Sequence, residues 1–89
     1  MTLESLDLRE IEAAVEAILF AAGEPLQIER ICLALDLDRP TAEQVLQKLG
    51  DHYAYERRGI RLVRMEDCYQ LCSSPDYADV IRKAFEIRK

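Results

Sequence analysis

Cys68, Cys72 and His52 are the side chains in the sequence with the most obvious capacity to bind a metal ion. The two cysteines are separated by three residues, whereas structural zinc sites typically use a C-x2-C pair. With the histidine they would supply three ligands at best. We therefore expect no metal site, and we interpret the cysteines as small, half-buried residues with reduced thiols.

Carboxylates one helical turn apart have the residue types that general acid–base catalysis uses. Glu12 with Glu16 and Asp76 with Asp79 are such pairs, but both are expected on solvated helix surfaces. The chain has only three glycines and no glycine-rich loop, which excludes a backbone cradle for a nucleotide. The sequence thus predicts no catalytic residues, no cofactor and no enzyme activity.

Four arginines form a basic segment: Arg57, Arg58, Arg61 and Arg64. Residues 39–89 carry a net charge of +2, whereas residues 1–38 carry −7, which gives −5 for the whole chain. An acidic chain repels the phosphate backbone of nucleic acids. The arginines are candidates for auxiliary contact with nucleic acid, or for ion pairs with the acidic half of the same or another chain.

The element that organises the chain is a predicted helix that Asp7 caps, with Glu10 in the position of a capping-box acid. Gly23 and Pro25 end it after about Ala22. Apolar residues with helical spacing predict one broad core face, which consists of Leu8, Ile11, Ala14, Val15, Ile18, Leu19 and Ala22.

Phe20 does not belong to that face, because it lies nearly opposite Ile11, beside Ala13 and Ala17. Small residues around an aromatic side chain allow another surface to approach closely. Ala13, Ala17 and Phe20 are therefore candidate self-association residues. The alternative is that Leu3 and Leu6 of an N-terminal arm, residues 1–6, fold back over Phe20.

The remaining pattern predicts a mainly α-helical fold with a small β-hairpin. Leu26–Ile28 is either extended or leads into the next helix, and Leu37 is an apolar turn residue between two helices. The predicted elements that follow are a helix at 28–35, a helix that Asp38 caps and that reaches Tyr55, strands at 60–65 and 68–72, and a last helix that Ser74 caps and Pro75 begins. This order is typical of a winged helix-turn-helix domain with three helices, a wing and a C-terminal helix, and it predicts a single domain over 7–89.

Duplex DNA is the usual ligand of this fold, with the third helix in the major groove. The outward residues of that helix are predicted to be Thr41, Glu43, Gln44, Gln47, Lys48 and Asp51. They include two acids, one lysine and no arginine, so this face is poorly equipped to hold phosphate. Direct DNA binding is expected to be weak or absent.

The stretch E-A-I-L-F-A-A-G-E-P-L, residues 16–26, resembles the opening of the bacterial segregation and condensation protein B family. Later segments resemble the same family in the same order, namely residues 28–31, 58–60, 69–71 and 74–77. The family usually has glycine before Tyr-Gln-Leu, where this chain has Asp67-Cys68, so its wing turn is expected to differ. Family members carry two winged-helix domains in tandem, and this chain resembles the first alone, with the second absent.

The resemblance implies a role as a homodimer that binds a ScpA-like kleisin and, through it, an SMC ATPase. Such complexes condense and segregate the chromosome, and the N-terminal domain is associated with self-association. The implied location is cytoplasmic and nucleoid-associated, and the sequence shows no basic signal-peptide start and no apolar run long enough for a membrane span. The alternatives are a DNA-binding winged-helix transcriptional regulator and a small thiol-based metal sensor.

Overall fold

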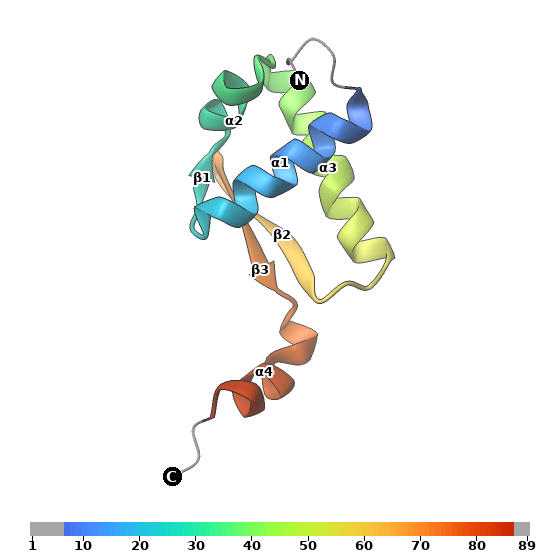
Figure 1. The fold of residues 1–89 in the computed structure, drawn as a ribbon, viewed down its shortest axis with the longest axis vertical. Helices are drawn as coiled ribbons and strands as arrows, with labels where there is room; N and C mark the ends of the chain where they lie inside the picture. Colours follow the sequence, from blue (N-terminus) through green and yellow to red (C-terminus); the bar gives the residue numbers. More distant parts are fainter. Residues whose placement is uncertain (1–6, 87–89) are drawn as a thin grey trace.

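A computed structural model describes residues 7–86 as three helices that pack around one end of a small sheet, with a fourth helix beyond it (Figure 1). The winged-helix prediction is confirmed, with one further strand. The elements are α1 (Leu8–Ala22), β1 (Leu26–Gln27), α2 (Ile28–Leu35), α3 (Arg39–Tyr55), β2 (Ile60–Met65), β3 (Cys68–Ser73), the 3-10 helix η2 (Pro75–Tyr77) and α4 (Ala78–Phe85).

Both predicted ends of α1 are confirmed. The Asp7 carboxylate accepts a hydrogen bond from the backbone N–H of Glu10, and the Glu10 carboxylate accepts one from the N–H of Asp7. Gly23 closes the helix with φ of 64°, a left-handed conformation that glycine adopts without steric cost. The prediction of a core position for Leu8 is wrong, because this first helical residue is exposed.

The helix-turn-helix consists of α2 and α3. Leu37, in the turn between them, is half-buried and packs against the core, as predicted. Asp38 occupies the cap position of α3, although its side chain makes no capping hydrogen bond. Helix α3 ends at Tyr55 as predicted, and the side chain of Tyr53 is buried.

The sheet has strand order β1-β3-β2, and both of its pairings are antiparallel. Leu26 pairs with Tyr69 and Gln27 with Cys68, which shows that the segment after α1 is a short strand. The backbone N–H of Ile28 extends this contact by donating to the carbonyl of Asp67 at 2.9 Å. Strand β3 is therefore paired along both of its edges near the wing tip, and the wing is tied to the start of α2.

The core lies between α1, α2, α3 and one face of the sheet. Its members are buried apolar side chains, namely Val15, Leu19, Ile28, Ile31, Ala42, Val45, Leu46, Leu49, Tyr53 and Tyr69. All of them come from the body of the fold, and none comes from η2 or α4. The last helix therefore contributes nothing to this core.

The chain between β3 and α4 differs from the prediction of one continuous helix. Pro75–Tyr77 form the 3-10 helix η2, and the α-helix begins only at Ala78. The hydroxyl of Ser74 accepts a hydrogen bond from the N–H of Asp76, so the predicted cap is present but serves η2.

The wing turn contains only Glu66 and Asp67, since Met65 pairs with Cys68 across it. Glu66 has φ of 57°, a region that side chains with a Cβ atom rarely adopt. Two-residue hairpin turns favour glycine at such a position.

We expect Glu66→Gly to raise the free energy of unfolding by about 0.5–1 kcal/mol, since it removes the strain at this φ. The matched control is Glu66→Ala, which removes the carboxylate but keeps the Cβ atom, and it should give no comparable gain. Urea unfolding of the three proteins measures the difference. Equal stability of the glycine and alanine variants would show that the turn is not strained.

Candidate functional site

The strongest candidate for a functional surface surrounds Phe20 on α1. Phe20 is 79% exposed, and Ala13 and Ala17 beside it are exposed as well. These three residues border a hollow of about 240 Å³, which we call the Phe20 hollow. Its lining residues are Ala13, Glu16, Ala17, Phe20, Ile60 and Leu71.

Helical geometry explains why Phe20 faces outward. Its neighbour Leu19 is only 1% exposed and points into the core with Val15, and successive residues are rotated by about 100° around a helix. An exposed phenylalanine bordered by alanines is an apolar surface whose side chains carry no hydrogen-bonding group. The alternative prediction, that Leu3 and Leu6 fold back over Phe20, concerns residues outside the described range.

The acid pair on α1 departs from the prediction of solvated side chains. Glu12 and Glu16 are half-buried and connect α1 to α3. A Glu12 carboxylate oxygen lies 2.6 Å from Nδ1 of His52, and Glu16 accepts a hydrogen bond from the hydroxyl of Tyr53. The prediction failed because both partners lie about 40 residues away in sequence and reach α1 only through packing. The two carboxylates thus connect α1 to α3 through side-chain contacts.

Burial raises the pKa of Tyr53 above the ordinary value of 10.0, and the hydrogen bond to the negatively charged Glu16 raises it further. Both effects favour the protonated phenol in the folded state. The folded chain therefore keeps a proton that the unfolded chain loses above about pH 10, and stability falls as the pH rises from there.

We expect Tyr53→Phe to be less stable than the parent by about 1–2 kcal/mol at neutral pH, because it loses the hydrogen bond to Glu16. This difference should shrink as the pH rises above 10, because the unfolded parent then loses the Tyr53 proton and the parent becomes less stable, whereas the phenylalanine variant has no such proton to lose. Denaturant unfolding of both proteins across the alkaline range measures it. A difference that stays constant with pH would contradict this role for the phenol.

The four wing arginines line two neighbouring hollows, and Arg61 borders both of them. Arg57, Arg58 and Arg61 line a hollow of about 430 Å³ with Asp76 and Tyr77. Arg58 pairs with Glu56 and Arg61 with Asp76, each at 3.5 Å. Arg64 lies nearer the wing tip, where its Nε donates to the carbonyl of Glu66 and its guanidinium lies over the ring of Tyr69, 5.8 Å from the centroid.

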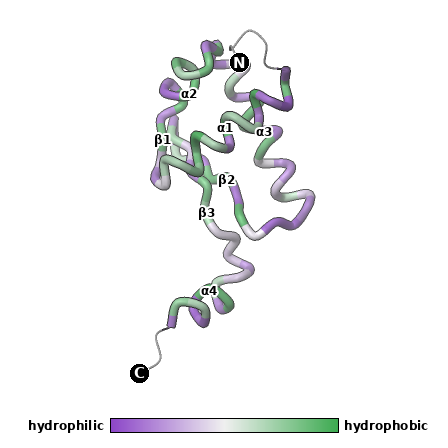
Figure 2. Tube along the Cα trace, in the orientation of Figure 1, coloured by the Kyte–Doolittle hydropathy of each residue, from purple (hydrophilic) through white to green (hydrophobic). Residues whose placement is uncertain are grey.

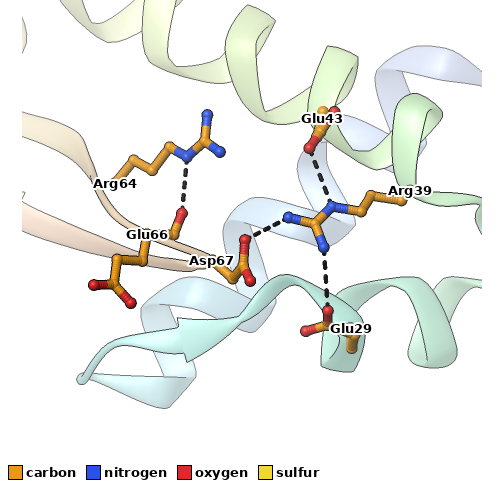
Figure 3. Close-up of polar contacts among 6 residues, drawn as sticks. All are labelled: Glu29, Arg39, Glu43, Arg64, Glu66 and Asp67. Atoms are coloured by element: carbon orange, nitrogen blue, oxygen red, sulfur yellow. Dashed lines mark hydrogen bonds and ion pairs between the residues drawn. The ribbon is translucent and has the colours of Figure 1, made fainter.

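Sequence reasoning missed Arg39, the first residue of α3. Its guanidinium contacts three carboxylates: Glu29 of α2 at 3.3 Å, Glu43 of α3 at 3.2 Å and Asp67 of the wing turn at 2.5 Å (Figure 3). The hydrogen bond to Asp67, and next that to Glu43, raises the pKa of Arg39 above its ordinary value. The spacing of Arg39 and Glu43 was the available signal, since residues four apart on a helix are neighbours.

The outward face of α3 is the surface that a DNA-reading helix would use. Arg39 and Glu43 are engaged with each other there, and Gln47 donates to Asp51 at 3.1 Å. Lys48 is exposed beside them. An arginine at the start of α3 that three carboxylates surround is poorly placed to bind phosphate as well.

The candidate metal ligands are not brought together. Cys68 and Cys72 lie on β3 with free thiols, while His52 on α3 contacts Glu12. Within residues 7–86, no three or more His, Cys, Asp or Glu side chains are grouped so that they could hold a metal ion.

Comparison with known protein families identifies the family of this chain. The family model described as segregation and condensation complex subunit ScpB matches residues 13–89. The chain belongs to this family. Proteins named segregation and condensation protein B are similar to it, at 36% identity over 84 residues in Ruminiclostridium cellulolyticum and 38% over 80 residues in Alkaliphilus oremlandii. The alignments cover 94% and 90% of this chain but only 44% and 43% of those relatives, so the chain spans less than half of their length.

Two solved structures of the family share the fold. One is a dimer of a ScpB N-terminal domain in complex with a ScpA peptide; it has 32% identity and a TM-score of 0.82, and the match covers 86% of this chain and 96% of that one. The other is ScpB from Mycobacterium tuberculosis, with 18% identity and a TM-score of 0.86 over 96% of this chain and 56% of that one, a likeness that shows the fold alone.

None of the helices between residues 7 and 86 combines the length and the apolar composition that a membrane crossing requires.

Proposed function

We propose that this chain is a non-enzymatic dimerisation and assembly module of an SMC–kleisin complex that condenses and segregates the chromosome. The observation that carries the proposal is its similarity, over almost the whole of that domain, to the dimeric ScpB N-terminal domain with a bound ScpA peptide. The partners are a second copy of the chain, a ScpA-like kleisin and, through the kleisin, an SMC ATPase. The place of action is the cytoplasm, at the nucleoid.

Self-association is proposed to use Ala13, Ala17 and Phe20. Support comes from the exposure of the phenyl ring and from the small residues beside it, which let a second surface approach the backbone of α1. Aromatic side chains that become buried in an interface are frequent hot spots for binding energy. The surrounding charge favours association with a basic surface, since residues 1–38 carry −7 and residues 39–89 carry +2.

The test is sedimentation velocity of the unmodified chain, alone and with a peptide from the kleisin of the same organism. We expect a dimer that binds the peptide. A monomer at all concentrations that does not bind the peptide would contradict the proposal.

Binding of duplex DNA at two salt concentrations separates the proposal from a winged-helix regulator. Weak binding is expected, because Arg39, Arg58 and Arg61 already contact carboxylates. Tight binding that weakens steeply with added salt would instead indicate a DNA-binding domain that contacts the phosphate backbone through Arg57, Arg58, Arg61 and Arg64.

A further inference from the structure

Helix α4 carries an apolar face of which Val80, Ala84 and Phe85 are exposed, whereas Ile81 is half-buried. On a helical wheel, Val80, Ile81, Ala84 and Phe85 fall within an arc of about 140°, whereas Arg82 and Lys83 lie outside it. Val80 is 63% and Phe85 78% exposed, although they are among the largest apolar side chains of the helix. Figure 2 shows hydrophobic and hydrophilic segments that alternate along this helix, as in an amphipathic helix that packs on another surface.

An eight-residue helix is too short to be stable without packing, because isolated helices need roughly 12–15 residues even with favourable sequences. Most helical stability in proteins comes from burial of an amphipathic face. The exposed face of α4 therefore requires a surface to cover it.

The junction before α4 directs the helix away from its own domain. Ser74 is buried, and its backbone N–H donates to the carbonyl of Gly59 at 2.8 Å. Its hydroxyl accepts from the N–H of Asp76, whose carboxylate pairs with Arg61 at 3.5 Å. Pro75, between them, has a fixed φ. Figure 1 shows the result, with α4 extending beyond the end of β3.

The Phe20 hollow lies at the same end of the sheet from which α4 departs. Ile60, one of its lining residues, pairs with Ser73 of β3, the residue just before the junction. A two-fold axis near this end would bring α4 of one copy to the hollow of another and repeat the contact reciprocally. The chain thus carries two exposed apolar surfaces whose positions suit an exchange of helices.

We propose that, in the dimer, each copy packs the apolar face of α4 into the Phe20 hollow of the other copy. This inference rests on the dimerisation proposed above and specifies what covers Phe20. The charges around the two surfaces are complementary. Glu10 and Glu16 flank Ala13, Ala17 and Phe20 on the wheel of α1, while α4 presents Lys83 and Arg82, the latter paired with Asp79 of its own helix at 2.9 Å.

Site-specific disulfide formation tests the exchange. In a full chain with Cys32, Cys68 and Cys72 replaced by serine, one copy carries Ala17→Cys and a co-expressed copy carries Ala84→Cys. Both alanines lie on helix surfaces, one exposed on α1 and one exposed on α4, so the fold should tolerate the changes, which circular dichroism verifies. We expect a disulfide-linked heterodimer under mild oxidation. The matched control is Leu33→Cys on α2 with Ala84→Cys, which should not cross-link.

Each of the following outcomes would overturn the proposed exchange of α4 between the two copies. Cross-linking of Ala17→Cys chains with one another in preference to Ala84→Cys would show that α1 packs against α1. A dimer in sedimentation without the expected disulfide would show that α4 does not pack beside Ala17 of the other copy, and it would leave the proposed dimer standing. A cysteine-free chain and a parent chain that both sediment as monomers would overturn the exchange and the dimer together.

Discussion

Replacing Phe20 with glutamate is expected to convert a dimer into a monomer. Two-fold symmetry places the substitution in the interface twice, and each copy would lose an aromatic contact and bury a carboxylate without a partner. A hot-spot loss of about 2 kcal/mol per copy weakens the dimer roughly a thousandfold. Sedimentation velocity over a range of concentrations measures this shift.

The matched control is Tyr55→Glu, which places the same charge on an exposed aromatic position at the end of α3. It should leave the sedimentation of the chain unchanged. If Phe20→Glu and Tyr55→Glu both sediment like the parent, Phe20 does not lie in the interface.

Truncation of Leu19, the neighbour of Phe20, should instead affect the stability of the fold. Leu19 is 1% exposed in the centre of the core, so Leu19→Ala removes buried apolar contacts and leaves a cavity. We expect a loss of about 3 kcal/mol in the free energy of unfolding, within the range of buried Leu→Ala substitutions. Denaturant unfolding measures it at a fixed protein concentration, because dimerisation makes the apparent stability depend on concentration.

Leu33→Ala provides the same chemical change at a position on α2 that is 82% exposed. It should change stability by less than about 0.5 kcal/mol, as surface substitutions usually do. A similar loss for Leu19→Ala and Leu33→Ala would mean that burial does not distinguish these leucines.

Local signals made most of the fold predictable. The capping box of Asp7 and Glu10, and Gly23 after α1, depend on residues within one helical turn, and the sequence alone shows them. Strand β1 could not be decided in this way. Two residues are too few for a periodic pattern, and their partners Tyr69 and Cys68 lie far along the chain.

The candidate site was predictable only in part. Helical periodicity placed Phe20 opposite the core, and the exposed ring confirms that position. The same reasoning put Glu12 and Glu16 in solvent, because a helical wheel does not show that His52 and Tyr53 approach from α3. For α4, the sequence predicted a last helix, but it does not reveal whether the same chain or another one covers its apolar face.

The pairing of β1 with β3 also has a consequence for how the chain folds. It joins segments about forty residues apart and encloses α2, α3 and β2 within one loop. The hairpin of β2 and β3 is a local contact that can form early. Strand β1 can pair with β3 only after the enclosed helices have brought these two strands close together. The rate-limiting step of folding is therefore expected to be closure of this loop, and mutations in β1 should slow folding more than mutations at the wing tip.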